Sequence, residues 1–185
     1  IGLKKDESSF YLELFPQWEQ VPMNELKGIN ATAIRESYFE GAVGLYPFED
    51  DVPYPVRKWL FETFLHKEEY MNLKAEYDFL KKYKEQWEDV PYPVIFNTVD
   101  AVVIQSGHVL MVKRKACPGE GLMALPGGFI NNKETIEKAV IRELKEETNI
   151  KLPIPVLEGH IRTRHVFDHP SRSERGRTIT HAFLI

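Results

Sequence analysis

Residues 127–150 read GGFINNKETIEKAVIRELKEETNI, and apolar residues recur in this segment with the period of a helix. The pattern predicts a helix from about Thr135 to Thr148, with the Thr135 side chain as its N-cap. Glu137 falls in the first turn, where a negative charge favours the helix dipole. The predicted apolar stripe consists of Ile136, Ala139, Val140 and Leu144. Ile141 does not fit this stripe and is expected on the outer side of the helix.

The glutamates of this helix continue the apolar stripe. These residues are Glu143, Glu146 and Glu147, whereas Lys138, Arg142 and Lys145 are expected to point elsewhere. A Glu-rich helix is usually a solvated face, but that alternative places the glutamates opposite the stripe. Because burying carboxylates without a partner is costly, a cation is expected among them. Oxygen ligands favour Mg²⁺, and the lack of His or Cys in the cluster disfavours zinc.

The spacing of the segment resembles the Nudix box. Five residues separate Gly128 from Glu134, and seven more precede the run RELKEETNI at residues 142–150. The box has glycine where Asn149 stands. Asparagine is the next-best residue for a left-handed position after a helix, so the departure is mild.

The resemblance implies a role for each charged residue of the box. Glu143, Glu146 and Glu147 would ligate Mg²⁺, with Mn²⁺ as the alternative metal. Glu134 would support the site, and Arg142 would orient a carboxylate through a fork-like ion pair. Gly127 and Gly128 would let the backbone approach the ligand closely. The implied reaction is attack of an activated water on a pyrophosphate, and the general base is not identified.

Five arginines follow the box within 16 residues. They are Arg162, Arg164, Arg172, Arg175 and Arg177. They fit either a solvated loop or recognition of phosphate, for which bidentate arginine is suited. The segment from Phe167 to His181 is similar to one in Nudix proteins of NAD metabolism that act on ADP-ribose. That likeness implies that Arg162, Arg164, Arg175 and Arg177 bind substrate. A metal site made of the nearby histidines is not expected.

The first half of the chain resembles the C-terminal part of nicotinamide-mononucleotide (NMN) adenylyltransferases. Asn30, Thr32 and Arg35 stand where that family has a motif that grips the ATP phosphates, with Asn30 replacing a serine. The alternative is an ordinary N-cap followed by a surface arginine. Trp18 is either a core residue or a stacking partner for the nicotinamide ring. The family's His-x-Gly-His element is absent, so this chain is not expected to make NAD by itself.

The whole chain therefore resembles the middle of a fused NMN adenylyltransferase/Nudix hydrolase, with both ends missing. The expected fold is α/β, with the C-terminal part of a Rossmann-like nucleotidyltransferase domain at residues 1–88. A linker at 89–93 contains two prolines, which favour extended backbone. A Nudix fold at 94–185 should contain a mixed sheet flanked by helices. Expected elements are a helical stretch over about 56–84, strands over 98–104 and 108–112, and a hairpin turn at Ser106 and Gly107.

Composition limits the function classes. A net charge of −4 and a pI of about 5.9 disfavour a nucleic-acid partner. There is no run of about 18 apolar residues, so no membrane span is expected. One cysteine, Cys117, allows no intrachain disulfide and fits a cytoplasmic setting.

The predicted function is hydrolysis of ADP-ribose to AMP and ribose 5-phosphate, in a protein whose complete form also joins NMN and ATP into NAD. One rival is a catalytically silent domain that senses ADP-ribose. Another is a first unit that serves only as a dimerisation scaffold, and a homo-oligomer is left open.

Overall fold

The computed structural model describes residues 1–185 except 5–6, 23–27 and 42–49. The chain forms two compact units, Ile1–Lys74 (unit 1) and Ala75–Ile185 (unit 2). None of the helices in the described segments is long and apolar enough to cross a membrane. The segment 89–93 contains neither helix nor strand. A domain boundary there stays a prediction, since the end of the preceding helix already belongs to unit 2.

Unit 1 combines a short parallel strand pair with helices. Strands β1 (Gly2–Lys4) and β2 (Gln20–Pro22) pair in parallel, and the 3-10 helix η1 (Glu7–Leu14) follows β1. Helices α1 (Ala31–Phe39), α2 (Tyr54–Glu62) and the 3-10 turn η2 (Phe64–His66) precede α3 (Glu68–Glu85), which continues into unit 2.

The helical stretch expected over residues 56–84 is confirmed, but it is divided into separate helices, because the chain leaves the helical conformation at Thr63 (φ −123°, ψ −58°). Aromatic side chains from both sides of this break pack together in one cluster. Across it, Trp59 and Phe64 stack with ring centroids 5.0 Å apart. Phe64 also meets the buried Tyr70 edge-on at 6.0 Å, and Tyr70 packs on Tyr38 at 5.4 Å. Neither proline nor glycine marks the break, so the sequence carried no signal for it.

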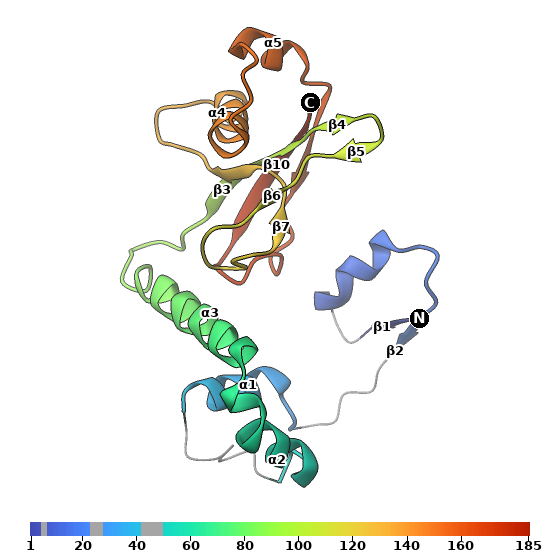
Figure 1. Cartoon of the computed structure of the whole chain (residues 1–185), viewed down its shortest axis with the longest axis vertical. Coiled ribbons are helices and arrows are strands. Elements are labelled where there is room, and N and C mark those ends of the chain that lie inside the picture. The colour runs from blue at the N-terminus through green and yellow to red at the C-terminus, as the bar shows by residue number, and fades with distance from the viewer. Residues whose placement is uncertain (5–6, 23–27, 42–49) are drawn as a thin grey trace. The chain divides into compact units, whose positions relative to one another are not determined.

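Unit 2 is built on a four-stranded mixed sheet (Figure 1), which confirms the predicted class. The strand order is β8 (Gly127–Phe129), β3 (Phe96–Val102), β10 (Thr178–Leu184) and β9 (Thr163–Phe167). The central pair β3 and β10 is parallel, and the two outer pairs are antiparallel.

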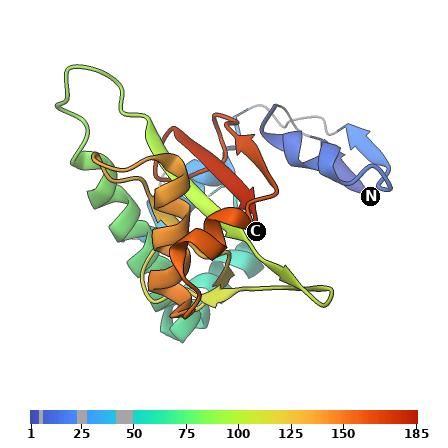
Figure 2. The same ribbon diagram turned by 90° about the horizontal axis from the view of Figure 1, so that it is seen from above.

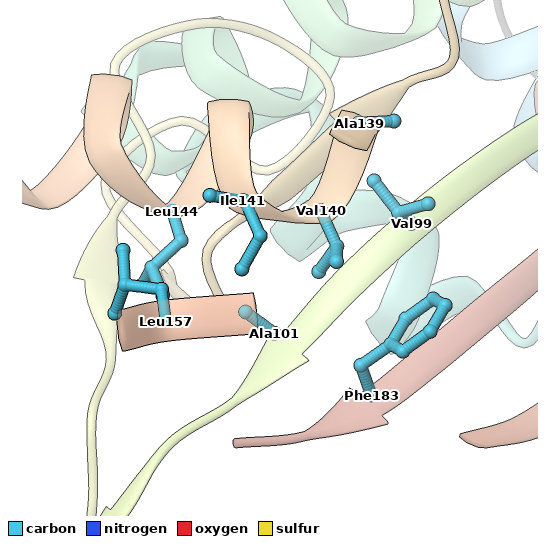
Figure 3. Close-up of a cluster of buried hydrophobic side chains, with 8 residues drawn as sticks. All are labelled: Val99, Ala101, Ala139, Val140, Ile141, Leu144, Leu157 and Phe183. Carbon is cyan, nitrogen blue, oxygen red and sulfur yellow. The ribbon is translucent and has the colours of Figure 1, made fainter. Parts of the chain in front are cut away.

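The core of unit 2 lies between this sheet and two helices, α4 (Ile136–Thr148) and α5 (Ile154–Gly159). Helix α4 packs on β3 and β8, and α5 packs on α4. Figure 3 shows the buried side chains, which are Val99, Ala101, Ala139, Val140, Ile141, Leu144, Leu157 and Phe183. The outer position expected for Ile141 is wrong: its side chain is 2% exposed. It belongs to the same cluster as Leu157 of α5, so the helix buries a broader face than one apolar stripe.

Two small strand pairs complete unit 2. Strands β4 (Ile104–Gln105) and β5 (His108–Val109) form a hairpin that extends away from the sheet (Figure 2). Its turn is confirmed at Ser106 and Gly107, which both have positive φ, as a two-residue hairpin requires. Strands β6 (Val112–Lys113) and β7 (Met123–Ala124) form the other pair. The two long strands expected over 98–104 and 108–112 are thus each divided into shorter ones.

Candidate functional site

Both ends of α4 are capped as the sequence predicts. Thr135 Oγ1 accepts a hydrogen bond from the Lys138 N–H at 3.3 Å. Asn149 adopts the left-handed conformation (φ 55°, ψ 25°), and its N–H donates to the Lys145 carbonyl at 2.9 Å. The buried positions of the helix fix its rotation, so its last two turns carry the glutamates toward β8.

The three glutamates line one cleft of about 410 Å³, here called the glutamate cleft. Its walls also include Gly127 and residues 112–117. Glu147 Oε2 accepts a hydrogen bond from the Gly127 N–H at 3.0 Å. The side chain of Glu143 is only 13% exposed, and burial raises the pKa of its carboxyl although Arg142 opposes the rise. Glu146 is 59% exposed at the mouth.

Arg142 holds these carboxylates together. Its Nη1 donates to Glu143 Oε1 at 2.8 Å and to Glu146 Oε2 at 3.1 Å. Nε and Nη2 bind the two carboxylate oxygens of Glu134, and Nη2 also donates to the Phe129 carbonyl. All five N–H groups of the guanidinium thus have acceptors. The expectation from helical spacing that Arg142 points away from the glutamates is wrong, because its long side chain bends back across the helix.

The two glycines of the turn are required by close packing against the protein itself. A Cβ on Gly127 would lie 2.2 Å from the Val99 carbonyl oxygen. A Cβ on Gly128 would lie 2.4 Å from Glu143 Oε1. Substituting either glycine therefore displaces β3 or the Glu143 carboxylate, before any ligand is considered.

The donor chemistry of the glutamate cleft fits a hard divalent cation. Its acidic groups are carboxylates, which such cations prefer, and neighbouring glutamates raise the pKa of Glu143. Among the described residues no three His, Cys, Asp or Glu side chains already converge closely enough to hold a metal. The carboxylates instead accept from Arg142 and Gly127, contacts that a cation would compete with.

A second cleft of about 280 Å³, here called the polar cleft, adjoins the first. Residues that line both clefts are Arg114, Ala124, Leu125 and Gly127. Arg175 lines the polar cleft, and its guanidinium lies over the Phe129 ring at 5.0 Å. Burial lowers the pKa of Arg175.

The other three arginines predicted to bind substrate line neither of these clefts. Arg162 is exposed, Arg164 lies 3.8 Å from Glu137, and Arg177 donates to the Asp168 carbonyl. Sequence reasoning missed Asp100 and did not single out Arg172, which both line the polar cleft. The available signal was the alternation of polar with apolar residues in β3, which is typical of an exposed sheet face.

In unit 1, the predicted nucleotide-binding residues lie at the start of α1. Asn30 Oδ1 accepts from the N–H groups of Thr32 (2.9 Å) and Ala33 (3.3 Å), so Asn30 is the N-cap. Arg35 Nη2 donates to Thr32 Oγ1 at 3.3 Å, and the side chains are exposed. Trp18 stacks on Phe15 at 4.5 Å and is 41% exposed, so it is not a core residue. Binding of ATP and nicotinamide by these residues stays a prediction.

Comparisons with known proteins agree with this geometry. Residues 95–185 match the family described as NUDIX domain. The chain is 39% identical over 87 residues to the ADP-ribose pyrophosphatase of Methanocaldococcus jannaschii, covering 47% of this chain and 48% of that protein. It is 41% identical over 78 residues to the nicotinamide/nicotinic acid mononucleotide adenylyltransferase of Acinetobacter baylyi, covering 42% of this chain and 39% of that one.

A solved structure resembles nearly the whole chain. It is the bifunctional NMN adenylyltransferase/ADP ribose pyrophosphatase from Francisella tularensis, complexed with AMP and a manganese ion. The likeness has a TM-score of 0.76 at 40% identity and covers 98% of this chain but 53% of that one. The chain thus spans about half the length of these relatives or less.

Proposed function

We propose that unit 2, whose residues 95–185 match the NUDIX domain family, hydrolyses the pyrophosphate bond of ADP-ribose to AMP and ribose 5-phosphate. The proposed cofactor is Mg²⁺, with Mn²⁺ as the alternative. The observation that carries the proposal is the convergence of Glu143, Glu146 and Glu147 on one cleft beside Gly127.

Each of these residues has a proposed task. Glu143, Glu146 and Glu147 hold the metal, which when bound neutralises the pyrophosphate and lowers the pKa of the attacking water. Arg142 fixes the orientation of Glu143 through its Nη1 and is itself fixed by Glu134. The Gly127 N–H fixes the orientation of Glu147 by donating a hydrogen bond to its Oε2. The carboxylates are thereby oriented by other parts of unit 2 before any ligand binds, which favours transition-state stabilisation.

ADP-ribose is proposed as the substrate on two grounds. The Methanocaldococcus relative is an ADP-ribose pyrophosphatase, and the Francisella structure contains AMP, one of the expected products. Arg175 lines the polar cleft, which adjoins the glutamate cleft. Its partly buried guanidinium can donate two hydrogen bonds to a phosphate group.

For the complete protein we propose a second activity, adenylylation of NMN with ATP. The likeness of the chain to the Acinetobacter and Francisella proteins supports this proposal. Thr32 and Arg35, joined at the start of α1, are the proposed contacts to the ATP phosphates. Asn30 orders the same turn by capping it.

The test is hydrolysis of ADP-ribose by this chain with millimolar Mg²⁺, with released AMP measured by chromatography. Glu147→Gln should lower kcat by at least about a hundredfold with little effect on the melting temperature. Glu88→Gln makes the same change at an exposed position that does not line the cleft and is the matched control. Wild-type binding of ADP-ribose without AMP release would instead support a sensor, and equal activity in Glu147→Gln would refute the assignment.

A further inference from the structure

The central sheet of unit 2 has one apolar and one polar face. Along β3, Val99 and Ala101 point into the core beneath α4. Side chains alternate along a strand, so Thr98 and Asp100 lie on the opposite face. There β10 places Thr178 and Thr180, with Thr180 directly beside Thr98 in the parallel register. Thr98, Thr178 and Thr180 are only 6%, 2% and 2% exposed, so this polar face is covered rather than solvated.

The polar face is the floor of the polar cleft. Thr98 Oγ1 and Thr180 Oγ1 share a hydrogen bond of 2.7 Å. Arg172 Nη1 donates to Thr180 Oγ1, so a buried hydroxyl pair holds the guanidinium at the cleft. This contact supplies Arg172 with a fixed position before any ligand arrives.

Asp100 lies in the same cleft with its acceptor capacity unused. Among the described residues, none donates a hydrogen bond to the Asp100 carboxylate or forms an ion pair with it. Burial raises the pKa of the Asp100 carboxyl, and Arg172 and Arg114 oppose that rise. A partly buried carboxylate without donors is costly, so its place in the polar cleft points to donors that arrive with a ligand.

The position of the cleft restricts the ligand. It shares the wall formed by Arg114, Ala124, Leu125 and Gly127 with the glutamate cleft, where the diphosphate is proposed to bind. In ADP-ribose, each phosphate is esterified to a ribose. A group that enters a neighbouring cleft from the diphosphate is therefore a ribose, which carries vicinal hydroxyls.

We propose that the polar cleft binds one ribose of the substrate, with Asp100 accepting hydrogen bonds from its vicinal hydroxyls and Arg172 and Arg175 donating to the attached phosphate. The inference rests on the proposed function for its substrate class. Carboxylates bind ribose hydroxyls in this way in dinucleotide sites. A fixed guanidinium is equally suited to a phosphate oxygen.

The test is equilibrium binding to this chain by calorimetry, with Ca²⁺ replacing Mg²⁺ to suppress turnover. Three ligands are compared: ADP-ribose, its 2′-deoxyadenosine analogue, and its analogue with 2-deoxyribose at the terminal position. Wild type should bind one analogue at least about tenfold more weakly than ADP-ribose, since one hydrogen bond to a charged group is lost. Which analogue is affected identifies the ribose.

Asp100→Asn should weaken ADP-ribose binding about tenfold, and the dissociation constants of the ribose and deoxyribose ligands should become nearly equal.

Thr180→Val releases Arg172 and should weaken the binding of all three ligands alike. The ratio between the dissociation constants of the ribose and deoxyribose ligands should therefore stay at the wild-type value. Asp89→Asn removes the same charge at an exposed position and should match wild type. Melting temperatures verify that each variant is folded.

Equal binding of all three ligands by wild type would overturn the inference without any variant. An unchanged ratio in folded Asp100→Asn would also overturn it. Either result is compatible with AMP release in the hydrolysis assay, so the proposed function would stand. If wild type distinguishes the ribose from the deoxyribose ligands but releases no AMP, the ribose site would be supported and the proposed hydrolase activity would be refuted.

Discussion

Arg142 and Glu134 form a two-point ion pair, with Nε 3.0 Å from Oε2 and Nη2 2.7 Å from Oε1. The pair ties the loop before α4 to the middle of the helix. Because Nη1 of the same guanidinium contacts Glu143 and Glu146, the loop, the helix and the glutamate cleft share one cation.

Replacement of this arginine by lysine should therefore affect folding and activity together. An ammonium group cannot provide the planar fork that serves three carboxylates. In Arg142→Lys, the free energy of unfolding should fall by about 1–3 kcal/mol and kcat by at least about tenfold. Urea denaturation and AMP release measure the two effects, and a variant with wild-type values in both would show that the fork is dispensable.

Acid should weaken the same pair. The Arg142 guanidinium lowers the pKa of Glu134 from its ordinary 4.5 to about 2. A carboxyl with a lowered folded-state pKa contributes stability above pH 4.5 and loses that contribution as pH falls toward 2. The stability difference between wild type and Glu134→Gln should thus be full at pH 6 and shrink below pH 4.5. Denaturation curves across this range check it, and a constant difference would contradict it.

Glu143 should show the opposite behaviour. Burial raises the pKa of Glu143, so folding favours its protonated form and stability is lost as pH rises through the folded-state value. In metal-free solution at neutral pH, Glu143→Gln should melt at or above the wild-type temperature. Millimolar Mg²⁺ should raise the melting temperature of wild type by relieving carboxylate repulsion, and raise that of the variant less. Thermal melts with EDTA and with Mg²⁺ decide, and a wild-type melting temperature that Mg²⁺ leaves unchanged would count against the metal site.

Asn149→Gly should be tolerated. Asn149 occupies the left-handed region at the end of α4, where glycine has no steric penalty. Activity should stay at the wild-type value, and stability should change by less than about 1 kcal/mol. Asn149→Val places a β-branched residue in the same conformation and should cost about 1–2 kcal/mol. Equal stability of the two variants would show that this conformation is not maintained.

The elements that sequence reasoning predicted correctly depend on local signals. Thr135 and Asn149 mark the ends of α4 by capping chemistry, and Ser106 with Gly107 marks a hairpin turn. The glutamate cleft followed from the same local pattern, because residues three or four apart share a helix face.

The errors and omissions arose where distant segments meet. Ile141 is buried in the cluster that includes Leu157 of α5, which no periodicity within α4 can reveal. Asp100 lines the polar cleft together with Arg172 and residues of β10, which are far from β3 in the sequence. The polar cleft is formed by segments that are distant in the sequence, whereas the three glutamates of the glutamate cleft all lie on one helix.

The two faces of β3 separate two kinds of constraint within seven residues. Val99 and Ala101 pack in the core that keeps the domain folded, while Thr98 and Asp100 line the polar cleft on the opposite face of the sheet. Substitutions at alternate positions can therefore alter ligand preference while leaving the core composition intact. Such a strand allows a lineage to acquire new substrates without first losing its fold.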